Sequence, residues 1–322
     1  MATDSSHVLL ISDNVWGRHQ GRIRDIAPDM EVIVYEGEEP IADDIIQRVT
    51  LAFFSQDVWP ERSRGFVLST MKATSLQWYH TFSAGVDSPF FIDLMDRGVR
   101  LTNSSGATAS PIAQTAILYM LALSRNARAW FEHQDRHEWQ RHDLVELDGA
   151  NLAVIGMGPI GEEIARLGVA LNMNVEGIRR TPTGKEPCAT YSFDALHNVL
   201  AKADWVAVAL PLADETRNLF NAELFGIMKP GAHFVNVGRG ELVDEPALIN
   251  ALRSGHLAGA ALDVFATEPL PEDSPLWDMK NVIITPHSSG ASPKAGLRSE
   301  DLFVENLAKF LAHEPMRNEI HR

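Results

Sequence analysis

Three polar side chains in the second half of the chain are suited to acid–base chemistry on a carbonyl group. Arg239 lies between two glycines, Glu268 opens the run Glu-Pro-Leu-Pro, and His287 follows the apolar run 282–285. A planar guanidinium can bind a carboxylate and polarise a carbonyl, and an imidazole can give a proton to an alkoxide near neutral pH. A carboxylate beside the imidazole would fix its orientation. Together these residue types predict chemistry on a 2-keto or 2-hydroxy acid, although each residue taken singly has an ordinary structural explanation.

A glycine-rich turn supplies the second chemical feature, a site for the phosphates of a dinucleotide. The run 152–161 reads Leu-Ala-Val-Ile-Gly-Met-Gly-Pro-Ile-Gly and leads from a predicted strand into a predicted helix. In such turns the first glycine permits the tight bend, the second lets the pyrophosphate approach the backbone, and the third lets helix and strand pack closely. The helix N-terminus adds unpaired N–H groups and partial positive charge. The predicted phosphate-binding residues are Gly156, Gly158, Pro159, Ile160 and Gly161.

The residues after the next predicted strand bear on which nicotinamide cofactor binds. About 20 residues past the glycines, an NAD-binding chain usually carries an acid for the ribose 2′-hydroxyl. This chain carries Arg179, Arg180 and Thr181 there. Guanidinium groups could instead bind the 2′-phosphate of NADP(H), so we expect NADP(H) as the preferred cofactor and NAD(H) as the alternative. The competing explanation is two solvated arginines that do not discriminate between the cofactors.

Composition argues against several other classes of protein. The chain has 322 residues and a formal net charge of −15, which disfavours non-specific binding to nucleic acid or to anionic membranes. No run of about 18 apolar residues occurs, so no transmembrane helix is expected. The single cysteine, Cys188, rules out an intramolecular disulfide and a Cys-based metal cluster, and we expect no metal. A single cysteine suits a reducing compartment, and the short, polar N-terminus has no signal-peptide pattern, so the chain is expected to be cytoplasmic.

Short apolar runs alternate with helical patterns along the whole chain, which is typical of parallel sheets covered by helices on both faces. Long helices are predicted at 110–125, with Ser110 as N-cap, and at 293–313. Because they bracket a second block of alternating elements, we expect one domain to be inserted into another. Residues 1–104 and 289–322 are expected to form the substrate domain, and 105–288 the dinucleotide-binding domain. Strands are predicted at 7–12, 31–35, 51–55, 78–82 and 100–103 in the first, and at 152–155, 174–178, 205–210, 233–237, 259–262 and 282–285 in the second.

Several motifs, taken together in their order and spacing, resemble those of the D-isomer-specific 2-hydroxyacid dehydrogenase family. They are Phe-Ser-Ala-Gly-Val-Asp at 82–87, the glycine turn, Ala-Leu-Pro-Leu at 209–212, Val-Gly-Arg-Gly at 237–240, Leu-Asp-Val-Phe at 262–265, Glu-Pro-Leu-Pro at 268–271 and Thr-Pro-His at 285–287. The resemblance covers nearly the whole chain. It implies two Rossmann-like, doubly wound parallel-sheet domains of the α/β class, with the active site in the interdomain cleft. It also implies a homodimer formed through the cofactor domains.

The resemblance gives a role to each matching residue. His287 would be the general acid/base, Glu268 its partner, and Arg239 the anchor of the substrate carboxylate and carbonyl. Backbone N–H groups of the turn Ala84-Gly85-Val86 would also hold the carboxylate. The expected reaction is the reversible reduction of a small 2-keto acid to the D-2-hydroxy acid by hydride transfer from NADPH. Around the cofactor, Asp263 would receive the nicotinamide carboxamide, and the other expected neighbours are Leu210, Pro211, Val237, Gly238, His287 and Gly290.

The sequence departs from the family pattern at two places, and it leaves open a second function and the identity of the substrate. Gln114 stands where the family often has Glu, and arginine replaces the acid after the second cofactor-domain strand. Glu268 argues against formate oxidation, since formate-oxidising relatives place Gln opposite the histidine. A nucleotide-sensing binding protein, like the C-terminal-binding transcriptional corepressors, would share the fold and the catalytic residues. The substrate choice includes glyoxylate, hydroxypyruvate, branched-chain keto acids and phenylpyruvate, and a loop at 14–16 with Trp16 is expected to face the cleft.

Overall fold

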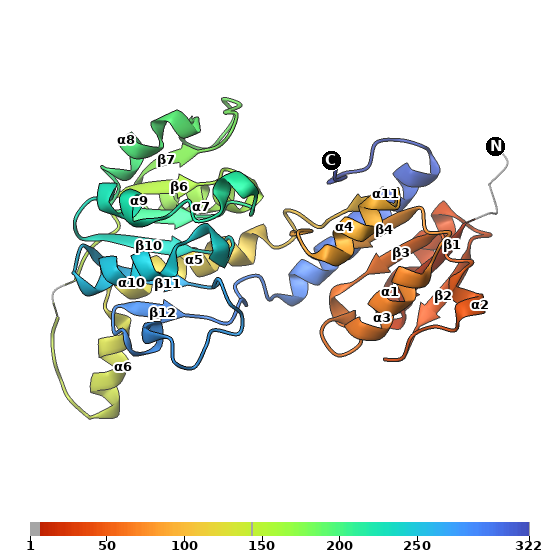
Figure 1. The fold of residues 1–322 in the computed structure, drawn as a ribbon, viewed down its shortest axis with the longest axis horizontal. Coiled ribbons are helices and arrows are strands. Elements are labelled where there is room, and N and C mark those ends of the chain that lie inside the picture. Colours follow the sequence, from red (N-terminus) through yellow and green to blue (C-terminus); the bar gives the residue numbers. More distant parts are fainter. Residues whose placement is uncertain (1–6, 143, 322) are drawn as a thin grey trace. The chain divides into compact units, whose positions relative to one another are not determined.

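The computed structural model describes residues 7–142 and 144–321 of the chain. These residues divide into two compact units: unit 1 comprises the described part of Met1–Thr108 and Ser292–Arg322, and unit 2 that of Ala109–Ala291. Each unit is a parallel β-sheet with helices on both faces (Figure 1). The predicted α/β class with two doubly wound parallel sheets is therefore confirmed.

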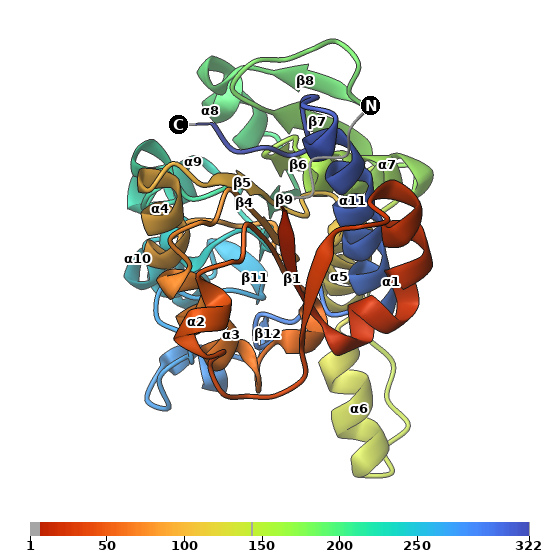
Figure 2. The ribbon, with the colours of Figure 1, turned by 90° about the vertical axis from the view of Figure 1, so that its right-hand side faces the viewer.

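Unit 1 is built, within the described residues, on a parallel sheet of five strands. From edge to edge they are β2 (Glu31–Tyr35), β1 (Val8–Ser12), β3 (Leu51–Phe54), β4 (Trp78–Thr81) and β5 (Arg100–Thr102). One face is covered by α1 (Asp13–Ile26) and α11 (Pro293–Leu311), which run side by side (Figure 2), and the other by α2 (Asp43–Ile46), α3 (Ser63–Lys72) and α4 (Pro89–Asp96). The strand order reverses between β1 and β3, and open α/β sheets bind ligands at the carboxyl ends of strands next to such a reversal.

The first and last parts of the chain pack together in unit 1 because both carry apolar stripes. Val15 of α1 and Phe303 of α11 are fully buried in one cluster. Helix α1 follows β1 directly, since the Ser12 side chain accepts a hydrogen bond from N of Val15 at 3.3 Å and so caps the helix. The predicted loop at 14–16 is therefore wrong, because the helix already begins at Asp13. Trp16 lies in its first turn and packs, half-buried, against the same apolar cluster.

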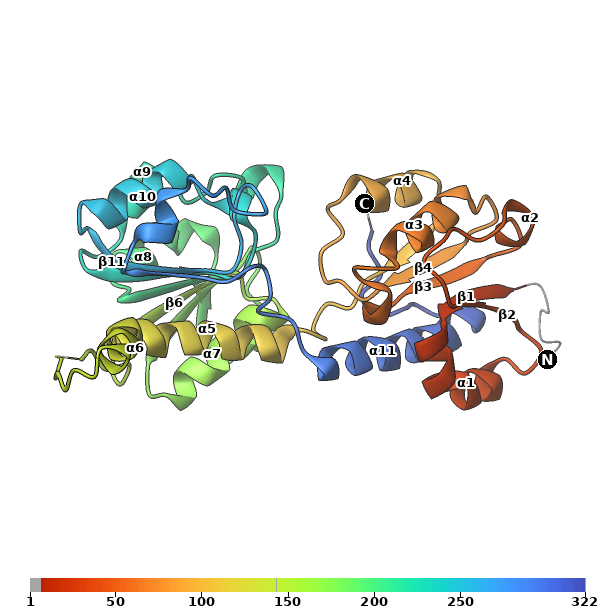
Figure 3. The ribbon, with the colours of Figure 1, turned by 90° about the horizontal axis from the view of Figure 1, so that it is seen from below.

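Unit 2 is built, again within the described residues, on a parallel sheet of seven strands. From edge to edge they are β12 (Val282–Ile284), β11 (Leu257–Leu262), β10 (Ala232–Asn236), β9 (Trp205–Val208), β6 (Asn151–Ile155), β7 (Asn174–Ile178) and β8 (Ala189–Tyr191). Helices α5 (Ala109–Ser124) and α7 (Pro159–Ala170) cover one face, and α8 (Leu196–Leu200), α9 (Ala222–Ile227) and α10 (Glu245–Arg253) cover the other (Figure 3). The strand order reverses between β6 and β9, which is where dinucleotides bind in this architecture.

Three local features of unit 2 were not predicted correctly or were not predicted at all. Helix α5 begins at Ala109, so Ser110 is not its N-cap; the Ser110 hydroxyl instead accepts a hydrogen bond from Nε2 of Gln114 at 3.1 Å. The three-residue edge strand β8 is too short to give a periodic signal. Helix α6 (Ala127–Asp135), which buries none of its residues, projects from the rest of unit 2 (Figures 1 and 2). Among the described helices, none combines the length and apolar character that crossing a bilayer requires.

Candidate active site

The glycine turn between β6 and α7 has the geometry that its sequence predicts. Gly156 has a φ of +104°, and a Cβ there would lie 2.8 Å from the backbone of Ala209. A Cβ on Gly161 would lie 1.9 Å from the carbonyl oxygen of Gly156. At Gly158, the N-cap of α7, no atom of the described chain beyond the two neighbouring residues lies within 4 Å of the Cβ position. The protein itself thus requires the first and third glycines, whereas the second leaves open space at a helix N-terminus, where a phosphate fits.

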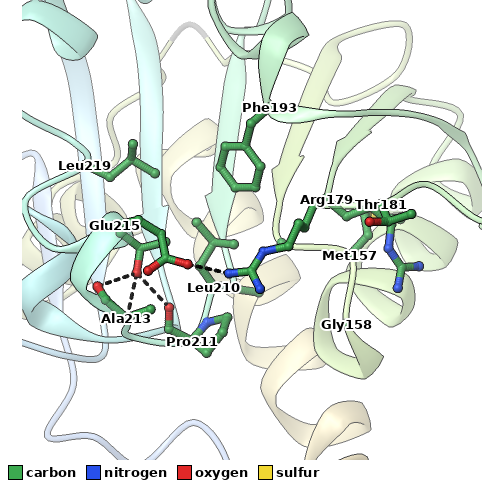
Figure 4. A pocket seen from close by; sticks show the side chains of 14 residues that line it. Met157, Gly158, Arg179, Thr181, Phe193, Leu210, Pro211, Ala213, Glu215 and Leu219 are labelled. Atoms are coloured by element: carbon green, nitrogen blue, oxygen red, sulfur yellow. Dashed lines mark hydrogen bonds and ion pairs between the residues drawn. The ribbon is translucent and has the colours of Figure 1, made fainter. Parts of the chain in front are cut away.

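A pocket of about 650 Å³ lies beside this turn, at the carboxyl ends of β6, β7 and β9 (Figure 4). Its wall brings together seven residues that were predicted to bind the cofactor. They are Gly156, Gly158, Arg179, Arg180, Thr181, Leu210 and Pro211. The first residues of α7, Pro159 and Ile160, follow the turn directly, and the pocket wall also contains the rings and aliphatic chains of Phe193, Leu219 and Met157.

Arg179 forms an ion pair with the buried carboxylate of Glu186. Its Nη1 atom lies 2.8 Å from Oε1 of Glu186, whose side chain is 2% exposed, and 3.5 Å from Glu162. Glu186 also accepts hydrogen bonds from N and Oγ1 of Thr183, both at 2.8 Å, and from N of Lys185 at 3.1 Å. Hydrogen bonds, that of the Thr183 backbone first and then those of the Thr183 side chain and of Arg179, outweigh the opposing effect of burial and lower the pKa of Glu186 to about 2. The loop after β7 is therefore organised around one ionised side chain.

Arg180 is in a different environment, because it is exposed and pairs with an acid from another segment. Its guanidinium forms an ion pair with Glu215, with side-chain exposures of 81% and 62% respectively. Glu215 belongs to the short 3-10 helix η3 (Asp214–Thr216) and lies on the pocket wall opposite Thr181 (Figure 4). Ion pairs this exposed contribute little free energy, so Arg180 can exchange its partner at low cost.

The loop that carries Arg239 follows β10 and is held by the last residue of that strand. The buried Asn236 donates from Nδ2 to the carbonyl of Arg239 at 2.9 Å and accepts from N of Gly238 at 3.0 Å. Next to them, a Cβ on Gly240 would lie 1.8 Å from the carbonyl carbon of Phe265. The Arg239 loop is thus packed backbone to backbone against the segment that leads to Glu268, with the Arg239 side chain half-buried.

His287 and Glu268 form the pair that their residue types suggest. Nδ1 of His287 lies 2.9 Å from Oε2 of Glu268, and their side chains are 51% and 38% exposed. The other oxygen of Glu268 accepts from N of Phe265 at 3.1 Å. His287 has a φ of +49°, and its own N–H donates to the carbonyls of Asp263 (2.8 Å) and Thr285 (3.1 Å). Because Nδ1 is bound to the carboxylate, Nε2 is the ring atom left to exchange a proton with a substrate.

Asp263 anchors the loop on which His287 lies. Its side chain, 1% exposed, accepts hydrogen bonds from Oγ1 of Thr285 at 2.6 Å, from N of Ser288 at 2.9 Å, and from N of Ser289 at 3.0 Å. The Ser289 hydroxyl also donates to it. A carboxylate offers about four lone-pair sites, so the loop up to the predicted contact residue Gly290 occupies the accepting capacity of Asp263.

The turn Ala84-Gly85-Val86 follows β4 in unit 1 and presents backbone N–H groups. Two of its carbonyls accept hydrogen bonds: Oγ of Ser83 donates to that of Gly85 at 2.8 Å, and Nδ2 of Asn103 donates to that of Ala84 at 2.5 Å. None of the three N–H groups of the turn donates a hydrogen bond within residues 7–142 and 144–321. These N–H groups can therefore bind an anion, whereas Arg239, Glu268 and His287 all belong to unit 2.

Sequence reasoning missed three residues that shape this site. Glu186 and Glu215 are acids in loops, where a charge is usually solvated, and only the folded loop shows which arginine each one faces. Asn236 carried a better signal, since a polar residue at the end of a buried strand often has a local hydrogen-bonding role. In the described part of the chain, no three His, Cys, Asp or Glu side chains are grouped to hold a metal ion.

Comparisons of sequence identify relatives that share this site region. Residues 117–289 match the family described as the D-isomer specific 2-hydroxyacid dehydrogenase, NAD binding domain. The chain is 36% identical over 245 residues to glyoxylate/hydroxypyruvate reductase B of Escherichia fergusonii, which covers 73% of this chain and 75% of that protein.

Comparisons of structure extend the similarity to the whole chain. A D-isomer specific 2-hydroxyacid dehydrogenase family protein from Aeromonas salmonicida has a TM-score of 0.82 and 32% sequence identity, over 99% of both chains. A D-isomer specific 2-hydroxyacid dehydrogenase from Xanthobacter autotrophicus Py2, solved in complex with NADPH and MES, has a TM-score of 0.79 and 29% identity, over 98% of both chains. The motifs, the two parallel sheets and these relatives agree, and the chain belongs to the D-isomer specific 2-hydroxyacid dehydrogenase family.

Proposed function

We propose that this enzyme reduces a small 2-keto acid to the D-2-hydroxy acid, reversibly, and prefers NADPH to NADH. The observation that carries the proposal is the His287–Glu268 pair, with Nδ1 and Oε2 2.9 Å apart, in the same unit as the Arg239 loop and the glycine turn. The glyoxylate/hydroxypyruvate reductase among the relatives supports a small 2-keto acid as substrate.

The proton of the product alcohol comes from His287 in this proposal. A bound nicotinamide dinucleotide supplies a hydride to the carbonyl carbon, and the carbonyl oxygen then needs a proton. His287 donates it from Nε2, because Nδ1 is bound to Glu268. Glu268 is itself fixed by the N–H of Phe265, so it orients the ring and stabilises the imidazolium form. In the oxidative direction the same atom accepts the proton.

Substrate orientation depends on the carboxylate group. Arg239 can bind that carboxylate through two parallel hydrogen bonds and bring a third N–H toward the carbonyl oxygen. The two hydrogen bonds of the Asn236 side chain and the close approach of Gly240 to Phe265 restrict the loop that carries Arg239. We assign the N–H groups of Ala84, Gly85 and Val86 to the same carboxylate, as the resemblance implies.

The pocket residues fit a nicotinamide dinucleotide. The open space at Gly158 and the N-terminus of α7 suit its pyrophosphate, and the apolar wall suits an adenine ring. Arg180 and Thr181 offer donors for a 2′-phosphate, and no carboxylate follows β7 directly to accept from a 2′-hydroxyl. Asp263 is assigned a supporting role, because its oxygens are used by the His287 loop; Leu210, Val237 and Gly238 are assigned to the cofactor side of the site.

A homodimer formed through unit 2 is also proposed. The projecting segment that includes α6 exposes Trp130 at 44%, Phe131 at 65% and Trp139 at 97%. Exposed aromatic side chains on one projecting segment are typical of a protein interface. Sedimentation of the parent and of Phe131→Glu tests it: the parent should sediment as a dimer and the variant as a monomer. The cytoplasmic location stays a prediction from the single cysteine, Cys188.

The experiment for the proposed reaction follows cofactor oxidation by the purified enzyme with glyoxylate, hydroxypyruvate, a branched-chain keto acid and phenylpyruvate. We expect turnover with at least one of them, faster with NADPH than with NADH, and chiral analysis should find the D-alcohol. His287→Gln, which keeps a side chain of similar size, is the control for adventitious reduction. Silence across the panel, with cofactor binding retained, would favour the nucleotide-sensing function.

A further inference from the structure

The cofactor pocket has an acidic residue that no predicted role explains. Glu215 lies on the wall opposite the loop after β7, on a segment that is 35 residues further along the chain than its partner Arg180. The ion pair between them joins the two sides of the pocket (Figure 4). A residue that binds an exposed arginine of the pocket wall can influence which cofactor that arginine receives.

A carboxylate and a phosphate compete for the same donors of Arg180. A 2′-phosphate brings nearly two negative charges and forms its strongest hydrogen bonds with guanidinium N–H groups. Glu215 already uses such a group, and a phosphate next to its carboxylate would be repelled. A cofactor with a 2′-hydroxyl does not meet this conflict, because it carries no charge at that position.

The neighbouring Arg179 cannot replace Arg180 in this exchange. Glu186 is buried and receives hydrogen bonds from Thr183 and Lys185 as well as from Arg179, so the pair is part of the loop structure. The pair of Arg180 with Glu215 is exposed on both sides, at 81% and 62%, and its exchange costs little. The two arginines therefore have separate tasks, and the acid that matters for a 2′-phosphate is Glu215.

We propose that Glu215 is a specificity-determining residue that competes with the 2′-phosphate for Arg180 and thereby limits the preference for NADPH over NADH. The proposal rests on the proposed function in one respect, the assignment of this pocket to the adenosine end of a nicotinamide dinucleotide. It predicts that removing the charge of Glu215 strengthens binding of a 2′-phosphorylated adenosine selectively.

The test uses the full-length protein and two fragments, 2′,5′-ADP and 5′-AMP, with affinities from isothermal titration. Glu215→Gln should bind 2′,5′-ADP about two- to fivefold more tightly than the parent, the range that exposed ion pairs allow, and the gain should shrink as salt is added. Affinity for 5′-AMP should change less. Asp214→Asn is the matched control, since it removes the same charge from the adjacent, exposed residue that does not line the pocket.

Three results would overturn the proposal. An equal gain in Asp214→Asn would show a general charge effect. Weaker 5′-AMP binding with unchanged 2′,5′-ADP binding in Glu215→Gln would make Glu215 a ligand of the ribose hydroxyl instead. A gain from Glu215→Gln that persists in an Arg180→Ala background would show that Arg180 is not the shared partner. Since binding of the fragments needs no turnover, a silent keto-acid panel would contradict the proposed reaction without affecting this test.

Discussion

Arg179 and Glu186 are joined at 2.8 Å between Nη1 and Oε1, and the carboxylate partner is almost entirely shielded from water. Arg180, the next residue along the chain, is 81% exposed and pairs with a carboxylate that is itself exposed. Two adjacent arginines in the loop after β7 thus have different environments, because each faces a carboxylate from a different segment. We expect them to respond differently to substitution.

The substitution Arg180→Ala should lower kcat/KM for NADPH and leave kcat/KM for NADH unchanged. The loss of one exposed charge-assisted hydrogen bond to the 2′-phosphate should lower kcat/KM for NADPH about tenfold, with the thermal unfolding temperature unchanged. Arg179→Ala should lower the unfolding temperature and weaken both cofactors, because it leaves Glu186 without its cation and loosens the loop after β7. Steady-state kinetics with both cofactors and thermal unfolding check this. An Arg179→Ala variant of parental stability with an NADPH-specific defect would contradict it.

His287→Gln should lower kcat by on the order of 10²–10⁴, the usual contribution of a general acid. Glu268→Gln should cost less, about 10- to 100-fold in kcat, because a neutral amide still reaches Nδ1 of His287 but loses a charge-assisted bond. Binding of the adenosine half of the cofactor should stay normal in both, since neither side chain lines the pocket beside the glycine turn and His287 is expected only at the nicotinamide end. Fluorescence titration with NADPH and stopped-flow reduction separate the two effects. Near-parental turnover in a folded His287→Gln variant would exclude it as the proton donor.

Arg239→Lys and Arg239→Ala should form a graded series. Removing the guanidinium leaves the substrate carboxylate without its main partner, which should lower kcat/KM for the keto acid on the order of 10²–10³. Lysine should restore part of this, since an ammonium attracts the carboxylate but cannot form two parallel hydrogen bonds. Initial-rate kinetics with the preferred keto acid give the measurement. Equal kcat/KM for the lysine variant and the parent would contradict the two-bond geometry.

Acid should destabilise unit 2 through His233. Its ring stacks on Trp205, with centroids 4.1 Å apart, and burial lowers its pKa from 6.5 to about 4. Between pH 6.5 and pH 4 the imidazole binds a proton in the unfolded state but stays neutral in the folded state. The contribution of His233 to the free energy of unfolding is therefore complete above pH 6.5 and is lost as the pH falls toward 4. The expected slope is at most about 1.4 kcal/mol per pH unit.

The variant His233→Phe keeps an aromatic ring against Trp205 but cannot bind a proton. Its unfolding temperature should therefore fall less steeply than that of the parent between pH 6.5 and pH 4.5. Above pH 7 the two curves should run parallel, which serves as the internal control. Identical curves at all pH values would mean that His233 is not the titrating group. His80, with a pKa lowered by burial to about 3, stays in both proteins and does not affect the comparison.

The sequence was most informative where a special residue followed a strand. Glycines at a strand–helix turn have few structural alternatives, and Gly156 and Gly161 indeed leave no room for a Cβ. Arg239 and His287 were located because each follows a predicted strand, and the carboxyl ends of parallel strands lie along one edge of a sheet. Periodicity and strand-end position therefore predicted the fold class and the segments that carry the candidate catalytic residues.

The sequence was least informative where two loops meet. The partner of Arg180 is set by η3, whose place depends on how the chain leaves β9, and no local pattern encodes that. The hydrogen bonds that Asp263 accepts were not predicted, because they depend on how the loop 285–289 folds over it. The start of α1 was misplaced because Ser12 serves at once as the last strand residue and as the helix cap. Such dual roles have no signature in a single sequence.

The contact between Gly240 and Phe265 has a consequence for directed evolution. A Cβ at position 240 would lie 1.8 Å from a backbone carbon that no rotamer can move, so a saturation library at this position should return glycine alone among active clones. Arg180 and Glu215, in contrast, are exposed, and we expect replacements there to leave the fold intact. A selection for altered cofactor use can therefore vary the residues at the adenosine end of the pocket. The distance between the loops that carry Arg239 and Glu268 should stay the same in all selected variants.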